Sequence, residues 1–89
     1  MNNTRRKAIV AIMDRLSNIM DDVSEIAEDI QTIRDEEDEA LESMPESLQE
    51  SERGETMREN VETLENAADA AEELSDAISD IYDQLDEIC

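Results

Sequence analysis

The sequence predicts an all-α protein: an antiparallel, coiled-coil-like helical hairpin that pairs with a second copy into a four-helix bundle. Two observations predict this class. Two long stretches carry apolar residues at alternating steps of three and four, which is the spacing of one face of a packed helix. The only Pro and the only Gly, at positions 45 and 54, both stand near the middle of the 89 residues. We therefore expect a single domain, residues 1–89, made of two helices and a short connection.

The first helix is predicted over about residues 4–43. Thr4 is in a position to cap its start, and no Gly or Pro interrupts it. Its apolar residues step regularly by three and four through Ile9, Ile12, Leu16, Ile19, Val23, Ile26, Ile30 and Ile33. Further apolar residues flank this series and widen the apolar face. They are Met13, Met20, Ala27 and Leu41.

The connection is predicted over about residues 44–51. Pro45 disfavours helical geometry for Met44 and can itself begin a short turn. Ser51 is a candidate cap for the second helix, whose first turn is weakened by Gly54. Because the connection is so short, we expect the two helices to be antiparallel neighbours.

The second helix is predicted over about residues 52–88. Its apolar residues also step by three and four, with one irregular step in an Ala-rich stretch where another helix can approach closely. They are Met57, Val61, Leu64, Ala67, Ala71, Leu74, Ile78, Ile81, Leu85 and Ile88. If the chain turns around residues 47–50, residues whose numbers sum to about 98 lie side by side. This register sets Arg15 near Asp83, and it sets Ile26, Ile30 and Ile33 against Ala67, Ala68 and Ala71.

A rod of two helices has little interior, and scaffolds of this size usually need a partner. We therefore expect a homodimer in which the apolar faces of two hairpins meet. The predicted core and dimer seam consists of Ile9, Ile12, Leu16, Ile19, Val23, Ile26, Ile30, Ile33, Val61, Leu64, Leu74, Ile78, Ile81, Leu85 and Ile88. In a second interpretation, Met13, Met20 and Met57 form an adaptable docking surface for another protein.

The chain carries 27 acidic and 7 basic residues, a formal net charge of −20. With only 18 Leu, Ile, Val and Phe residues, this composition borders on that of disordered proteins, but the regular apolar spacing favours helices. So acidic a chain repels phosphate backbones and anionic lipid surfaces. We therefore expect no direct binding to nucleic acid or to membranes.

Several kinds of catalytic site are excluded by the residues that are missing. The chain has no His and only one Cys, Cys89, which argues against Cys/His zinc sites and against His-activated nucleophiles. A single Gly cannot build a phosphate-binding loop. We expect no enzyme activity, no cofactor and no metal. A lone cysteine suits a reducing compartment, and the apolar stretch after Arg5-Arg6-Lys7 is too short for a secretory signal, so the expected location is the cytoplasm.

The acidic residues are unevenly distributed. Residues 1–20 have a net charge of +3, whereas residues 21–89 have a net charge of −23. Along the second helix, carboxylates recur at steps of three and four, and from residue 59 onward no Lys or Arg separates them. A second cluster precedes the connection. The candidate partner-binding residues are Asp35, Glu36, Asp38, Glu39, Glu59, Glu62, Asp69, Glu73, Asp76, Asp80, Asp83 and Glu87.

Two interpretations of these carboxylates are open. In the first, they only keep a thin rod hydrated. In the second, they mimic the phosphates of a nucleic acid and occupy the basic groove of another protein, whose cations relieve their mutual repulsion. A calcium or magnesium site has less support, because residues 35–39 lack the loop, the Gly and the spacing of an EF-hand.

Residues 44–53, Met-Pro-Glu-Ser-Leu-Gln-Glu-Ser-Glu-Arg, resemble a segment of small acidic proteins encoded by bacteriophages and prophages. In those proteins the segment also joins two helices rich in Glu, Ile and Leu, and the basic, Ile-rich start of this chain is similar to theirs. Gly54 departs from the larger residue expected after the Arg. The resemblance carries no residue roles. It implies a phage setting, the cytoplasm of a bacterial host, in which small acidic proteins often inhibit host nucleases or defence complexes.

We therefore expect a non-enzymatic inhibitor that docks through its carboxylates on the basic, nucleic-acid-binding surface of a host defence protein or nuclease. The alternative is a self-associating structural or adaptor protein. In that case the apolar seams bind partner helices, and the charge only keeps the rod in solution.

Overall fold

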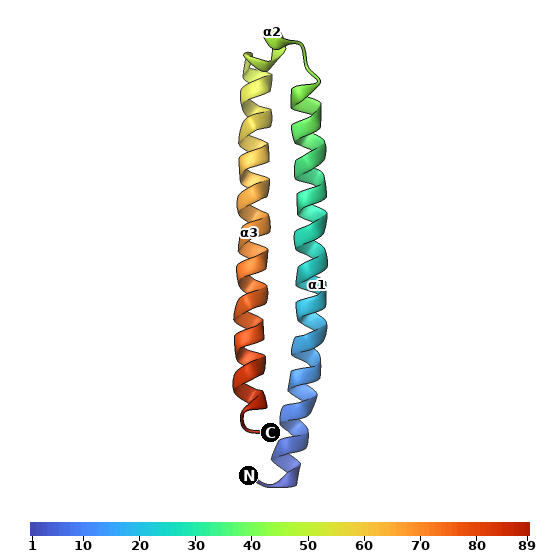
Figure 1. The fold of residues 1–89 in the computed structure, drawn as a ribbon, viewed down its shortest axis with the longest axis vertical. Coiled ribbons are helices and arrows are strands. Elements are labelled where there is room, and N and C mark those ends of the chain that lie inside the picture. The colour runs from blue at the N-terminus through green and yellow to red at the C-terminus, as the bar shows by residue number, and fades with distance from the viewer.

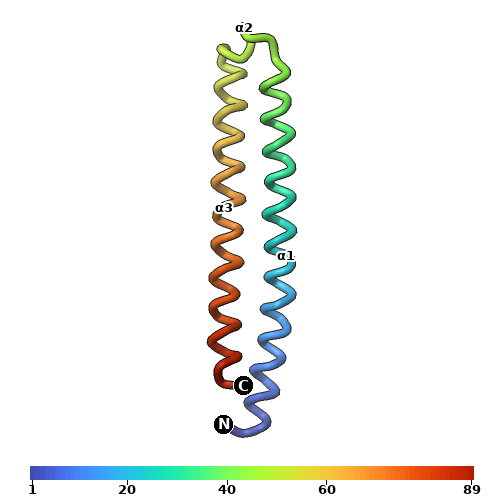
Figure 2. The backbone as a smooth tube through the Cα atoms, in the orientation of Figure 1, coloured from blue at the N-terminus to red at the C-terminus, as the bar shows by residue number.

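The computed structural model describes residues 1–89 as three helices and no strand: α1 (Asn3–Glu42), α2 (Glu46–Gln49) and α3 (Glu52–Asp86). The predicted all-α class is confirmed. The long helices α1 and α3 lie side by side and run in opposite directions, with α2 at the turn between them (Figure 1). They form a rod 69 Å long and 14 by 13 Å across, with both termini at the end opposite α2 (Figure 2). No helix contains an apolar stretch long enough to cross a membrane.

The two long helices begin close to the expected residues, but with different capping groups. Asn2 caps α1, because its Oδ1 accepts the Arg5 backbone N–H at 2.9 Å. The predicted cap at Thr4 is wrong, since Thr4 already lies inside the first turn. Ser51 does hold the N-cap position of α3, but its hydroxyl donates to the Leu48 carbonyl and accepts no backbone N–H of α3.

The connection between the long helices contains the single turn of helix α2. It begins directly after Pro45, whose carbonyl accepts the backbone N–H groups of Leu48 and Gln49 at 2.9 and 3.0 Å. Proline suits this place, because its fixed φ matches the start of a helix and its missing N–H is not needed there. The turn expected after Pro45 is therefore a helical one.

Gln49 ties the connection to both long helices. Its side-chain amide donates to the carbonyls of Met44 and Glu42, at 2.8 and 3.3 Å, near the end of α1. Its backbone carbonyl accepts a hydrogen bond from the Arg58 guanidinium of α3 at 2.8 Å. The same carbonyl presses on the start of α3, where a Cβ on Gly54 would lie only 2.0 Å from the Gln49 oxygen. Position 54 therefore needs glycine for this close approach.

The contact between α1 and α3 uses two residues in every seven from each helix. On α1 the inward residues, buried or half-buried, are Ile9, Met13, Leu16, Met20, Val23, Ala27, Ile30, Arg34, Glu37 and Leu41. On α3 they are Met57, Val61, Leu64, Ala68, Ala71, Ser75, Ile78, Tyr82 and Leu85. Ala68 is the most buried of all, at 2% exposed. The cross-helix contacts Gln31–Glu72, Arg34–Glu65 and Glu37–Asn60 join residues whose numbers sum to between 97 and 103.

Only half of the predicted seam residues of the first helix face α3. Ile9, Leu16, Val23 and Ile30 face α3, whereas the residues between them, Ile12, Ile19, Ile26 and Ile33, are exposed. The expected contact of Ile26 and Ile33 with the Ala-rich stretch is therefore wrong. The reason is rotational: α1 is turned about its axis so that the flanking series Met13, Met20, Ala27 and Leu41 points inward instead. The expected proximity of Arg15 and Asp83 gives no ion pair, since both ion pairs in the structure involve Arg34.

We expect Gly54→Ala to lower the free energy of unfolding by about 1–3 kcal/mol, the usual range for overpacking. Helix propensity alone predicts the opposite, because Ala exceeds Gly by about 1 kcal/mol in a helix interior. Thermal unfolding followed by circular dichroism measures the sign. The control is Thr56→Ala, an exposed position of the same helix turn, which should change little. A stabilised Gly54→Ala protein would show that α2 does not press on α3.

Candidate functional site

Seven of the ten large apolar side chains that are exposed form two straight stripes, one along each long helix. On α1 they are Ile12, Ile19, Ile26 and Ile33, each 44–53% exposed. On α3 they are Leu74 and Ile81, followed by Ile88 just beyond the end of the helix, each 48–51% exposed, and the exposed Ala67 extends the series. Because seven residues make almost two turns, residues spaced by seven lie in a line along a helix. We call these two sets the apolar stripes.

Both apolar stripes lie on the same side of the rod. Each stripe residue of α1 comes three residues after an inward residue, as Ile26 follows Val23, and α3 repeats this offset, as Ile81 follows Ile78. Two antiparallel helices are related by a local two-fold axis perpendicular to the plane that contains them. Equal offsets therefore turn both stripes towards the same side, where they form one long apolar face.

The predicted carboxylates of α3 point away from that face. Asp69, Asp76 and Asp83 each precede a stripe residue by five positions, which is about 140° around a helix. Glu62 has the same position in the seven-residue repeat, whereas Glu59, Glu73, Asp80 and Glu87 come one residue before a stripe position, about 100° around the helix. All eight are exposed. From Glu59 to Glu87 this acidic row is about 42 Å long. The rod thus has an apolar face and a separate acidic face on the outer side of α3.

Only one of the twelve predicted partner-binding residues has a cationic partner. Asp35 accepts a hydrogen bond from Arg34 Nη1 at 2.8 Å, so this carboxylate is already engaged within the chain. Asp38 is half-buried, while Glu36 and Glu39 are exposed. Apart from Asp35, none of the twelve lies within 4 Å of a Lys or Arg nitrogen. Eleven of the twelve predicted residues therefore have no ion pair within the chain, whereas Asp35 is already paired with Arg34.

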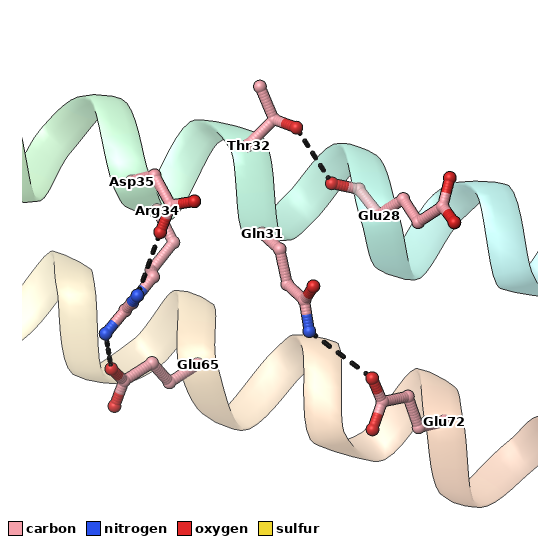
Figure 3. Close-up of polar contacts among 7 residues, drawn as sticks. All are labelled: Glu28, Gln31, Thr32, Arg34, Asp35, Glu65 and Glu72. Carbon is pink, nitrogen blue, oxygen red and sulfur yellow. Dashed lines mark hydrogen bonds and ion pairs between the residues drawn. The ribbon is translucent and has the colours of Figure 1, made fainter.

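Arg34 is the centre of a polar section in the contact between the long helices. Its Nη2 reaches Glu65 of α3 while Nη1 holds Asp35, and one helix turn away Gln31 donates to Glu72 at 3.3 Å (Figure 3). The hydrogen bonds to Asp35 and then to Glu65 raise the pKa of Arg34 above its ordinary value. Nearer the turn, Asn60 donates to Glu37 at 3.2 Å. Charge and hydrogen bonding thus replace apolar packing in this part of the rod.

Arg34 was missed as an interface residue by the sequence analysis. The signal was present, because Met13, Met20, Ala27, Arg34 and Leu41 are spaced by seven. A cation at such a position does not extend an apolar series, so apolar spacing alone does not reveal it. Gln49 and Arg58 carry no sequence signal of their own, because their partners are backbone carbonyls.

No three His, Cys, Asp or Glu side chains converge in a way that could hold a metal ion. Gln31, Arg34, Asp35, Glu65, Ala68 and Asp69 border a shallow hollow beside the ion pair. Comparison of the chain with protein-family models, curated proteins and solved structures finds no match.

We expect Arg34→Glu to lower the melting temperature, because it places a third carboxylate beside Asp35 and Glu65 and removes their cation. Arg53→Glu is the matched control. Arg53 is exposed in the first turn of α3 and makes no ion pair, and an anion there suits the helix dipole. Adding Glu65→Arg to Arg34→Glu should recover most of the loss, measured by thermal unfolding. If the double variant is no more stable than Arg34→Glu, the two side chains do not pair across α1 and α3.

Proposed function

We propose that this protein is a non-enzymatic, acidic interaction protein that docks on the basic, nucleic-acid-binding surface of another protein. One observation carries the proposal: an exposed acidic row about 42 Å long, free of Lys and Arg, on a straight helix. The contact residues are the eight carboxylates of that row, with Glu36, Asp38 and Glu39 near the turn. A surface that only had to stay hydrated would gain stability from cations at i+4, and this helix has none there after Arg58.

The physical basis of this docking is relief of repulsion. Carboxylates three or four residues apart on a helix lie roughly 5–6 Å from one another and repel, at a few tenths of a kcal/mol for each pair. A groove lined with Lys and Arg replaces that repulsion with attraction and speeds the encounter of the two proteins. Because α3 holds the row in line before binding, little conformational entropy is lost on docking.

The same proposal includes the place of action, which is the cell of a bacterial host. The resemblance of residues 44–53 to a segment of phage-encoded acidic proteins supports a bacterial host as the place of action. There the partner is a nuclease or a defence protein with a basic groove. Within this segment the hydrogen bonds of Pro45, Gln49 and Ser51 shape the turn. The proposed docking residues are carboxylates outside the segment.

The helical hairpin is further proposed to act as a homodimer, a four-helix bundle in which the apolar stripes of two copies cover one another. Seven Ile and Leu side chains per copy are about half exposed, and burying the remainder of each contributes roughly 1 kcal/mol. The acidic row stays on the outside of such a bundle, because its carboxylates lie about 100–140° around the helix from the stripe of α3. Pairing and docking therefore use different faces of α3, while Glu36 of α1 lies beside Ile33 at the edge of the pairing face.

A second candidate function is favoured by the stripes themselves. In this alternative the protein is a structural or adaptor protein whose apolar face takes up a helix of a different protein. The carboxylates then serve only hydration and suppress non-specific association.

Replacing Asp76, Asp80, Asp83 and Glu87 by Asn and Gln should abolish binding to the basic partner and leave helicity unchanged or higher. Pull-down from a bacterial lysate at low and high salt, with DNA as a competitor, measures the first effect, and circular dichroism the second. Binding by the unchanged protein should fall steeply with salt and be displaced by DNA.

The charge-matched control removes four carboxylates from α1, with Asp14 and Asp21 changed to Asn and Glu25 and Glu28 to Gln. It should keep most of the binding. A partner that survives both the α3 changes and high salt would rule out docking through the acidic row.

Ile26→Asp should convert the dimer to a folded monomer, because Ile26 is 52% exposed in the single chain and would be covered only by the second copy. Val23→Asp is the contrasting variant. Val23 is 8% exposed and faces α3, so a carboxylate there should unfold the rod. Sedimentation equilibrium gives the mass, and circular dichroism gives the fold. If Ile26→Asp remains dimeric, the apolar stripes are not the pairing face. If it keeps the dimer but loses a different protein from the pull-down, the adaptor function is favoured.

A further inference from the structure

We propose that the two copies pair with their rods antiparallel, so that the turn of each copy lies beside the termini of the other. This orientation rests on the proposed pairing through the apolar stripes, and it specifies which residues of the two copies meet.

The four isoleucines of the α1 stripe and the whole α3 stripe share a common centre, and the exposed Ala40 adds one small residue to the α1 stripe beyond Ile33. The stripe of α1 runs from Ile12 to Ile33, so its midpoint falls between Asp22 and Val23. The stripe of α3, from Ala67 to Ile88, has its midpoint between Ala77 and Ile78. The register of the contacts between Arg34 and Glu65 and between Gln31 and Glu72 sets these two midpoints at the same height of the rod.

A two-fold axis across the rod at this height therefore serves both stripes at once. On α1 it brings Ile12 level with Ile33 of the second copy, and Ile19 level with Ile26. On α3 it brings Leu74 level with Ile81, and the small Ala67 level with Ile88. The side chains that flank the α3 stripe are small or uncharged (Thr63, Ala70, Ala77 and Gln84), so two copies of α3 can approach closely there.

Charge decides between this orientation and the parallel one, which the apolar stripes alone would also allow. Residues 23–77, the half of the rod that contains the turn, carry 20 acidic and 3 basic residues, whereas the other half carries 7 acidic and 4 basic. Parallel rods would set the two strongly acidic halves against each other. Antiparallel rods set each of them against the half with little net charge, which lowers the repulsion between copies.

Individual charges agree with the antiparallel orientation. Arg15 flanks the α1 stripe and lies level with Asp29 of the second copy, which flanks the stripe in the same way. The basic run Arg5-Arg6-Lys7 lies level with Asp38 and Glu39 of the second copy, which lie about 160° and 100° around α1 from the stripe and attract the run only over a longer distance. Among the charged residues that flank the α1 stripe, only Asp22 faces a like charge, which is Asp22 of the second copy. In the parallel orientation Arg15 would instead lie beside Gln84, without a carboxylate partner on the facing side.

A charge exchange tests the Arg15–Asp29 pairing in the full-length protein. Arg15→Glu should raise the dimer dissociation constant roughly tenfold, because two attractive contacts become repulsive. Adding Asp29→Arg should restore the dimer. Within one chain these residues are fourteen apart, about 21 Å along α1, so only a contact between copies explains recovery. The matched control adds Asp21→Arg instead, on the outward side, and should not recover. Sedimentation equilibrium measures all three, and equal dissociation constants for the two double variants would overturn the orientation.

Crosslinking provides a second test that does not depend on weakened pairing. Asp22→Cys combined with Cys89→Ser places one thiol beside the axis, and a short thiol-specific crosslinker should join two copies. Antiparallel rods hold the two native Cys89 residues roughly 35 Å apart along the bundle, so the unchanged protein should not be joined. The reverse pattern would show parallel rods and overturn this orientation while leaving the dimer in place. A chain that sediments as a monomer would overturn the pairing itself.

Discussion

The arrangement of this protein depends on one constraint: each long helix carries three apolar positions in every seven, and a single antiparallel neighbour covers only two of them. The contact between α1 and α3 takes up the inward residues, among them Met13, Ala27 and Ile78. The third position, occupied by Ile12, Ile19, Ile26 and Ile33 on α1, is left about half exposed. A thin rod cannot avoid this outcome, because it has no third layer to cover the remaining stripe.

The turn determines the register of α3 along α1, that is, which residues of the two helices lie level with each other. Gln49 binds the end of α1 through its side chain and the start of α3 through its backbone carbonyl, and Gly54 lets that carbonyl lie directly on the helix. A different turn would slide α3 along α1. The Arg34–Glu65 contact then supports the same register further along the rod. Register in turn determines that the two apolar stripes are centred at one height.

Charge completes the organisation of the rod. The carboxylates of the acidic row lie away from the inward residues and from the apolar stripe of α3, so the row does not oppose either contact. They repel one another along α3, and this repulsion lowers the stability of the isolated rod while it favours a cationic neighbour. The few basic residues near the N-terminus leave that half of the rod with little net charge. The proposed docking surface and the proposed orientation of the dimer both follow from this uneven distribution.

The all-α class and the extent of both long helices could be predicted from the sequence, because the spacing of apolar residues and the positions of Pro45 and Gly54 act locally. The predicted bounds differ from those of α1 and α3 by no more than two residues. The exposure of the α3 carboxylates was equally predictable, since an unpaired charge is not buried. What the sequence left open was the rotation of each helix about its own axis. Ile26 and Val23 are equally apolar, and only the packing around Ala68 and the turn at Gln49 decides that Val23 faces inward and Ile26 outward. The pairing of Arg34 with Glu65 is a tertiary outcome for the same reason, since these residues are 31 apart in the sequence and meet only where α3 lies beside α1.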